Sequence, residues 1–309
     1  KRDGPRLTSM LSSISPVELS ALVAHRGFHC PRDGSSRRPL ENSLSAFELA
    51  WAGGVQLCEW DVALTKDEKL VLAHDETFSR LALNPTSQSS QMKVGDLTLK
   101  EIISLTFKSG SRPPLLIDVL TSARALESNC KLVIEIKPGN IEASTALVRL
   151  FRHHPDLIDS CAVVMSFDAF IMHRLKCELN DLSSFLGYDS NMMPQVLLLT
   201  VAEQPQKHYE LWLNILDPSP VHSWLQHENK PSLDGVYLQY QPEMLEPAGM
   251  QSLKDLSKQY RVGVWGYYKK DPDDYKTAKH LISCGVSFVN TDLPRTFKLE
   301  PKEHRMALY

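Results

Sequence analysis

The sequence lacks the features that mark membrane proteins and nucleic-acid-binding proteins. Its 34 Lys and Arg nearly balance its 37 Asp and Glu, and the formal net charge is −3. Such a balance gives no reason to expect nucleic acid or an acidic membrane as a partner. No apolar run reaches the roughly 20 residues of a membrane-spanning helix. These absences predict a globular chain without a transmembrane segment, and they leave the oligomeric state open.

Cysteine is also scarce, with six residues in 309, too few for a disulfide-stabilised scaffold. None has a partner at metal-ligand spacing, which argues against a zinc site. Cys58, Cys161 and Cys284 lie in apolar stretches, where a thiol behaves as a small hydrophobic group. No Asn-x-Ser/Thr sequon occurs, and the two absences together favour a reducing, cytoplasmic location. Because the chain begins with Lys1 and not Met, a removed targeting segment is left open.

The length of 309 residues allows two average domains or one α/β barrel. Short apolar runs alternate with stretches of helical periodicity along most of the chain. The expected strands are 21–25, 55–64, 132–137, 162–167, 195–201, 235–239, 262–266 and 286–290. The expected helices are 43–52, 115–126, 141–153, 169–179, 209–216, 247–260 and 272–283.

Solidly apolar strands that alternate with helices predict a parallel sheet covered by helices. Eight such units favour a closed (β/α)8 TIM barrel over an open sheet. We therefore expect an N-terminal arm at 1–16, a single barrel domain at 17–296 and a C-terminal tail at 297–309. The irregular stretch after the second strand contains an extended run at 69–74 and a short helix. Thr98 and Glu101 form a predicted capping box for that helix, and we interpret the whole stretch as a connection inside the barrel domain.

Acidic residues lie on the strand expected at 55–64. Glu59 and Asp61 are two residues apart, so a strand points both carboxylates to one face. Taken alone, such a pair is more often a solvated strand edge than a metal site. Glu135 and Lys137 repeat the spacing at the end of the next apolar strand, and the C-terminal strand ends of a barrel meet at one mouth. Three converging carboxylates need a cation, and all-oxygen ligation fits Mg²⁺ or Ca²⁺.

Two histidines end apolar runs in the same part of the chain. His25 ends the first expected strand, and His74 ends the extended run at 69–74. A lone histidine at a strand end is more often a surface or core residue than a catalyst. Imidazole nevertheless has the pKa range for proton transfer near neutrality, and the neighbouring carboxylates raise the odds of a functional role.

These motifs resemble those of the glycerophosphodiester phosphodiesterase family, which has the barrel of the PLC-like phosphodiesterases. The specific ones, in chain order, are His25-Arg26-Gly27, Glu41-Asn42-Ser43, Glu59-x-Asp61-Val62 and His74-Asp75-Glu76-Thr77 with Arg80. Weaker likeness continues in Glu135-Ile136-Lys137, Ser166-Phe167 and Thr291-Asp292-x-Pro294. The resemblance runs from about position 23 to 294, most of the chain.

The resemblance implies a phosphoric diester hydrolase that releases glycerol 3-phosphate and an alcohol from a glycerophosphodiester. The implied roles are a divalent cation held by Glu59, Asp61 and Glu135, proton transfer by His25 and His74, phosphate binding by Arg26 and Lys137, glycerol contact by Trp265, and support from Glu41 and Asn42. For Trp265, simple core packing is an equal alternative. The sequence does not show which histidine is the acid, nor whether water or the glycerol 2-hydroxyl attacks first.

Two other functions remain in view. One is a phospholipase D that acts on lysophospholipids or sphingomyelin with the same barrel. The spider-toxin branch of that group ends in Asp-Asn-Pro-Trp, whereas this chain has Thr291-Asp292-Leu293-Pro294, which disfavours that branch. The other is an inactive binding barrel, which ranks last because the histidines and acids are all present. Leu40, Ser43 and Gly266-Tyr267-Tyr268 depart from the family pattern and leave the leaving-group preference open. No long amphipathic anchor is visible, so we expect a water-soluble substrate.

Overall fold

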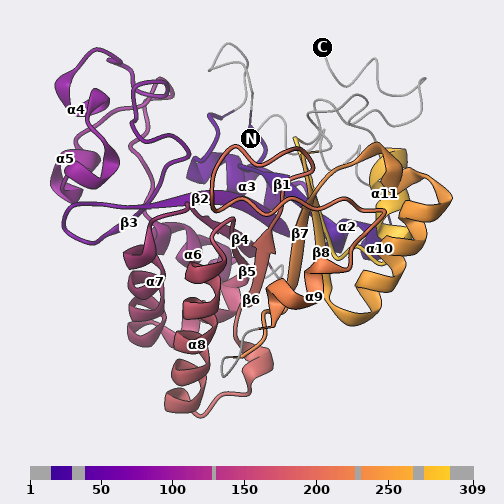
Figure 1. The fold of residues 1–309 in the computed structure, drawn as a ribbon. Helices are drawn as coiled ribbons and strands as arrows, with labels where there is room; N and C mark the ends of the chain where they lie inside the picture. The colour runs from indigo at the N-terminus through magenta and orange to yellow at the C-terminus, as the bar shows by residue number, and fades with distance from the viewer. Residues whose placement is uncertain (1–14, 30–38, 127–129, 227–230, 267–274, 293–309) are drawn as a thin grey trace, which may run out of the picture.

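The computed structural model describes residues 15–29, 39–126, 130–226, 231–266 and 275–292, and within these ranges eight parallel strands close into a barrel (Figure 1). In chain order they are β1 (Leu22–His25), β2 (Leu57–Leu64), β4 (Lys131–Ile136), β5 (Cys161–Ser166), β6 (Gln195–Leu199), β7 (Gly235–Gln239), β8 (Arg261–Trp265) and β9 (Phe288–Thr291). From β2 to β9 each strand pairs with the next of the eight, and β1 pairs with both β9 and β2. The ring is closed, and the predicted TIM barrel is confirmed.

The extended run after β2 forms one further strand, β3 (Leu70–Leu72), which pairs antiparallel with β2. The segment that follows β3 stands beside the barrel and contains α4 (Gln88–Gln91), η1 (Val94–Asp96) and α5 (Leu99–Ile103) (Figure 1). It has a small core of its own, in which the rings of Phe78 and Phe107 lie 5.8 Å apart.

Helices pack around the outside of the barrel (Figure 1). The α-helices are α2 (Pro16–Ala21), α3 (Leu44–Ala52), α6 (Leu116–Ala125), α7 (Ile141–His153), α8 (Ala169–Leu186), α9 (Pro220–Leu225), α10 (Pro247–Gln259) and α11 (Tyr275–Ser283). Short 3₁₀ turns are η2 (Pro155–Ser160), η3 (Ser190–Met192) and η4 (Pro242–Leu245). Among the helices in the described ranges, none is long and apolar enough to cross a bilayer.

Side-chain caps set the ends of several helices. The predicted capping box of α5 is present, with Thr98 and Glu101 each bonded to the other's backbone N–H. Asp168 caps α8 by accepting from two backbone N–H groups of its first turn. The helix expected at 169–179 continues to Leu186, where Gly187 ends it at φ 68°, a left-handed conformation that suits glycine.

The prediction of a helix at 209–216 is wrong. Trp212 instead forms an isolated parallel bridge with Val201, just past the end of β6. Its backbone hydrogen bonds go elsewhere: Leu213 N donates to Val201 O at 2.9 Å, and Ile215 N donates to the Gln241 side chain at 2.9 Å. Helical spacing of apolar residues was outweighed by these long-range bonds, and the helix in this connection is α9, further along the chain.

The barrel has an inner and an outer apolar layer. The inner layer includes Val23, Leu57 and Val133, each at most 6% exposed. The outer layer packs against the helices and includes Leu22, Cys58 and Leu132. Because side chains alternate along a strand, each strand contributes every second residue to the interior.

The domain boundaries stay a prediction. Positions 1–14 of the expected arm, the tail at 297–309, and the residues Tyr267, Tyr268, Leu293 and Pro294 lie outside the described ranges. The described strands from β1 to β9 all belong to the one sheet that forms the barrel.

Candidate active site

Strand alternation places the predicted site residues inside the barrel. On β2, Leu57 belongs to the inner apolar layer, so Glu59 and Asp61 point inward after it. On β4, Val133 is followed inward by Glu135. The register aligns Asp61 with Glu135, and it aligns His25 of β1 with Glu59. The apolar part of each strand thus ends in polar residues at one mouth of the barrel.

The three carboxylates gather around a lysine. Ligand atoms of Glu59, Asp61 and Glu135 all lie within 4.8 Å of one another. Lys137 Nζ lies 2.5 Å from Asp61 Oδ1 and donates to Glu135 Oε1 at 2.7 Å. Glu59 and Asp61 are 2% and 1% exposed, so water cannot offset their charges. The positive charge of Lys137 directly compensates the negative charges of Asp61 and Glu135.

The pKa values show that this compensation is incomplete. Burial and the charges of Asp61 and Glu135 raise the pKa of Glu59 well above its ordinary value. Burial also raises the pKa of Glu135, despite Lys137. Burial opposes ionisation of Asp61 too, but Lys137 and Arg26 outweigh it and hold the pKa of Asp61 below its usual range. The negative charges of Glu59 and Glu135 are therefore only partly compensated, and an additional cation would stabilise them.

A hard divalent cation fits this donor set. Oxygen ligands from buried carboxylates are what Mg²⁺ and Ca²⁺ take in proteins. Glu59, Asp61 and Glu135 are the residues that could hold it, and the raised pKa of Glu59 is the physical sign that the cluster favours an added cation. The expectation of a divalent-metal site is thereby supported.

His25 lies between two carboxylates. Its Nδ1 and Asp292 Oδ1 are 2.8 Å apart, and its Nε2 is 3.9 Å from Glu59 Oε2. Burial lowers the pKa of His25 to about 4, although the hydrogen bond to Asp292 opposes this shift. The partner Asp292 orients the imidazole and leaves Nε2 directed towards the acid cluster.

Arg26 and Asn42 sit in tight loops beside the acids. Both have left-handed backbones, with φ 54° and 50°, which non-glycine residues rarely adopt. A backbone bond from Asn42 N to Arg26 O at 3.2 Å joins the two loops. Asn42 Nδ2 donates to Asp61 Oδ2 at 3.3 Å, and Arg26 N donates to Glu59 Oε2 at 3.2 Å. The strained turns thus serve to direct donors at the acids.

His74 reaches the same region through a chain of charged groups. Its Nδ1 lies 2.7 Å from Asp75 Oδ1, and Arg80 Nε donates to Asp75 Oδ2 at 2.6 Å. Arg80 also donates to Glu41 Oε1 at 2.6 Å, and Arg26 donates to the same oxygen at 2.9 Å. His74 also acts to lower the pKa of Asp61, after the larger effects of Lys137 and Arg26.

Trp265 lies apart from this network. It ends β8 with its indole Nε1 donating to Thr200 O at 3.1 Å, and its ring meets that of Phe167 edge-on at 5.6 Å. These contacts agree with core packing. Its position at the C-terminal end of a strand also leaves the side chain on the mouth side, so a glycerol contact stays a prediction.

Sequence reasoning assigned no role to four residues that the structure brings to the site. Asp292, Asp75 and Arg80 were visible within motifs, but their pairings with His25, His74 and Glu41 join positions that spacing alone cannot connect. His29 was missed entirely. It is 4% exposed and its ring lies 6.4 Å from that of His25, in a loop without periodic pattern.

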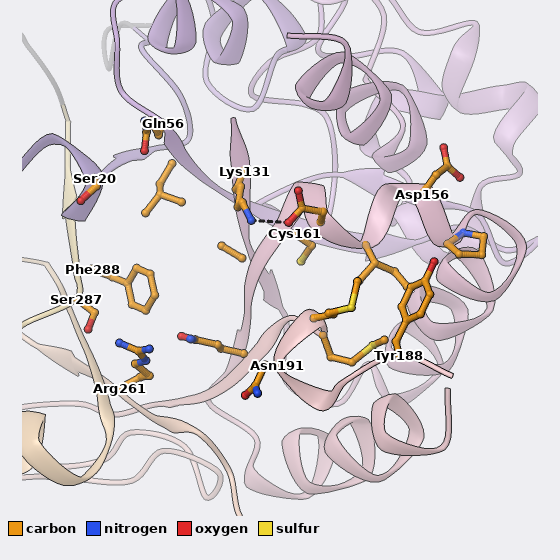
Figure 2. A pocket seen from close by; sticks show the side chains of 18 residues that line it. Ser20, Gln56, Lys131, Asp156, Cys161, Tyr188, Asn191, Arg261, Ser287 and Phe288 are labelled. Atoms are coloured by element: carbon orange, nitrogen blue, oxygen red, sulfur yellow. Dashed lines mark hydrogen bonds and ion pairs between the residues drawn. The ribbon is translucent and has the colours of Figure 1, made fainter. Parts of the chain in front are cut away.

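A hollow of about 840 Å³ lies at the opposite end of the barrel (Figure 2). The first residues of several strands line it, among them Lys131, Cys161 and Arg261. Lys131 Nζ donates to Asp159 at 2.6 Å across its wall. Catalytic groups of α/β barrels lie at the C-terminal strand ends, so the size of this hollow does not make it the active site.

The fold and the site together define a class: a (β/α)8 barrel with a cation-compatible acid cluster and histidines at its C-terminal mouth. The model of the glycerophosphoryl diester phosphodiesterase family matches residues 25–296, and the chain belongs to that family. The resemblance read from the motifs is confirmed.

Individual relatives agree with this assignment. The chain is 34% identical over 125 residues to a glycerophosphodiester phosphodiesterase of Caldanaerobacter subterraneus, covering 38% of this chain and 45% of that protein. It is 31% identical over 175 residues to a probable glycerophosphodiester phosphodiesterase 1 of Mycobacterium tuberculosis, covering 50% of this chain and 59% of that protein. The matched region therefore spans about half the length of these curated relatives.

The solved structures support the fold. A putative glycerophosphodiester phosphodiesterase from Galdieria sulphuraria superposes with a TM-score of 0.63 at 19% identity, covering 91% of this chain and 97% of that one. A phosphodiesterase from Oleispira antarctica, solved with its product sn-glycerol-3-phosphate, has a TM-score of 0.56 at 18% identity and covers 88% of this chain and 93% of that one.

Proposed function

We propose that the chain is a metal-dependent glycerophosphodiesterase, which hydrolyses a water-soluble glycerophosphodiester to glycerol 3-phosphate and an alcohol. The observation that carries the proposal is the inward row of His25, Glu59, Asp61 and Glu135 at the barrel mouth, with ligand oxygens of the three acids within 4.8 Å. Family membership and the product bound to the related Oleispira enzyme support the same reaction class. The boundaries 17–296 for one catalytic domain belong to this proposal.

Two histidines would move the protons. Displacement at phosphorus needs a base for the attacking hydroxyl and an acid for the leaving oxygen. Asp292 pairs with His25 at Nδ1 and Asp75 pairs with His74 at Nδ1, so in this proposal each imidazole would exchange its proton through Nε2. His25 ends β1 and His74 follows β3, so the two rings would approach a phosphate from different sides.

Charged groups would stabilise the phosphate as negative charge builds on its oxygens. Arg26 and Lys137 are the cations at the acid cluster and would contact those oxygens. A bound divalent ion, Mg²⁺ or Ca²⁺, would supply Lewis-acid stabilisation of the same charge. Glu41 and Asn42 would orient Arg26 and Asp61. Trp265 would pack against the glycerol unit.

The test is to incubate the protein with glycerophosphocholine, glycerophosphoinositol and lysophosphatidylcholine, each with Mg²⁺ or Ca²⁺, and to identify the phosphorylated product. Glycerol 3-phosphate from a soluble diester supports the proposal. Faster turnover of lysophosphatidylcholine than of glycerophosphocholine would overturn the water-soluble substrate in favour of a lysophospholipase D. No phosphorylated product from any substrate would overturn the catalytic proposal itself.

A further inference from the structure

We propose that Arg80 is a positioning residue that holds both His74 and Arg26 in their working orientations through one guanidinium group. The proposal rests on the proposed function for its kinetic part, because it deepens the account of the same site. Arg80 lies in the segment between β3 and α6, outside the strands that carry the acids.

One arm of Arg80 acts on His74. Arg80 Nε donates to Asp75 Oδ2 at 2.6 Å, while Asp75 Oδ1 lies 2.7 Å from His74 Nδ1. The two bonds use different oxygens of one carboxylate, so they hold at the same time. A carboxylate fixed in this way selects the imidazole tautomer with its proton on Nδ1. The Nδ1 contact then fixes the plane of the ring and the direction of His74 Nε2.

The other arm acts on Arg26. The terminal nitrogen of Arg80 donates to Glu41 Oε1 at 2.6 Å, and Arg26 donates to that oxygen at 2.9 Å. Arg26 Nε in turn lies 3.6 Å from Asp61 Oδ2. Glu41 is 7% exposed and carries one negative charge between two guanidinium groups. Loss of Arg80 would remove one of the two guanidinium groups that bond to Glu41 among the described residues, and it would shift Arg26 relative to the acid cluster.

The geometry requires arginine at this position. A guanidinium presents several N–H donors in a rigid plane and can bond two carboxylates at once, whereas an ammonium is a single point charge on a flexible stem. The neighbouring Phe78 and Leu81 are buried in the small core of the segment, 2% and 7% exposed, and anchor the backbone on either side of Arg80. The small core thus holds the backbone around Arg80 in place, while the Arg80 guanidinium group contacts charged residues at the mouth of the barrel.

The kinetic test compares Arg80→Met, Asp75→Asn and Arg112→Met on glycerophosphocholine. Arg112 is the matched control, since it donates to Asp118 at 2.7 Å on the surface and touches no site residue among the described contacts. We expect Arg80→Met and Asp75→Asn to lower kcat by about 10- to 100-fold, and Arg112→Met to leave it unchanged. Arg80→Lys should not restore kcat.

A double-mutant cycle separates positioning from simple structural support. In a His74→Ala background, Arg80→Met should lower kcat by a smaller factor than it does in the wild type, because the part of its effect that passes through His74 is already lost and only the part through Arg26 remains. The lowering of the unfolding temperature by Arg80→Met should instead be the same in both backgrounds. Full multiplication of the two losses in kcat would overturn the proposal.

A spectroscopic readout needs no substrate. In protein labelled with ¹⁵N-histidine, long-range ¹H–¹⁵N spectra report which ring nitrogen carries the proton, and His74→Ala identifies the signal. We expect an Nδ1–H imidazole in the wild type and a loss of that preference in Arg80→Met and Asp75→Asn. An unchanged tautomer in both variants would overturn the proposal. If the wild type hydrolysed none of the diesters, the proposed function would fail while this measurement still decided the role of Arg80.

Discussion

At the level of single residues, the site is a set of buried carboxylates whose charges the surrounding cations only partly offset. Lys137 and Arg26 hold the pKa of Asp61 down, yet burial and the neighbouring acids keep the pKa of Glu59 and Glu135 up. A protein retains such unfavourable charges where they bind something, because packing alone would favour neutral side chains. Two predictions follow from individual side chains.

The change Glu59→Gln keeps the shape of the side chain and removes one negative charge. We expect affinity for Mg²⁺ or Ca²⁺ to fall by at least about tenfold, while the metal-free protein unfolds at the same temperature or higher, because repulsion with Asp61 and Glu135 is relieved. Titration calorimetry and thermal unfolding measure the two effects. Glu142→Gln, an exposed residue at the start of α7, is the control and should bind the ion normally. Unaltered ion affinity in Glu59→Gln would contradict the metal assignment.

The changes His25→Ala and His74→Ala should each lower the rate by about 10² to 10⁴, the usual loss of a general acid or base. The double variant should lose less than the product of the two, since the histidines act as a unit. His153 and His154 are exposed at the end of α7 and should tolerate alanine without a change in rate. Steady-state kinetics on folded, metal-loaded protein decides the matter, and wild-type turnover in either single variant would refute the assignment.

At the level of elements, pairs of segments far apart in sequence are joined by a few polar contacts. The short helix α2 has a complete capping box, in which Ser15 and Glu18 bond each other's backbone. The same Glu18 accepts a hydrogen bond from the Tyr275 hydroxyl of α11 at 2.6 Å, and Lys279 lies 3.5 Å away. Glu18 therefore ties the helix before β1 to the helix before β9.

This contact predicts a pH-dependent contribution to stability. The hydrogen bond from Tyr275, with those from Ser15, lowers the pKa of Glu18 from 4.5 to about 2. A carboxyl group whose pKa is lower in the folded state stabilises the fold above pH 4.5, and it loses that contribution as the pH falls towards 2. Glu18→Gln should therefore unfold at a lower temperature than the wild type at neutral pH, and the difference should shrink between about pH 5 and pH 3.

Thermal unfolding followed across this pH range measures the effect. Asp181→Asn, an exposed change on α8, is the control and should show no such convergence with the wild type. A difference between Glu18→Gln and the wild type that stayed constant from neutral pH to pH 3 would contradict the role of Glu18.

At the level of the whole molecule, the barrel separates two ends with different tasks. The C-terminal strand ends gather the charged site, whereas the N-terminal ends surround the hollow lined by Lys131 and Arg261 (Figure 2). Glu59 and Asp61 of β2 and Glu135 of β4 form the acid cluster, so an ion bound there would link these two neighbouring strands.

Metal removal should therefore affect both activity and stability. Chelation with EDTA should abolish hydrolysis, and Mg²⁺ or Ca²⁺ should restore it. Because the three acids converge only in the folded barrel, a bound ion should also raise the unfolding free energy, by about 2.7 kcal/mol at one hundred times its Kd. Activity assays and calorimetry with and without the ion measure this. Full activity in EDTA, with elemental analysis showing no bound metal, would contradict the prediction.

Patterns among residues close together in sequence were sufficient to predict much of the structure of this protein. The two-residue period of a strand predicts that Glu59 lies on one face with Asp61, and Glu135 on one face with Lys137. The alternation of apolar runs and helices predicted the closed barrel, and the Thr98–Glu101 capping box was visible as a spacing of three. These features depend on residues close together in sequence, which is why the sequence alone determines them.

Contacts between distant positions were decided only by the tertiary structure. Asp292 meets His25 from 267 residues away because β9 and β1 are neighbours in the closed ring. Arg80 reaches Glu41 because the segment after β3 folds on its own core beside the mouth. The segment 209–216 has helical periodicity, yet its N–H groups bond to Val201 and Gln241. In each case the deciding energy comes from a partner that strand register and barrel closure bring near, and no local pattern encodes that partner.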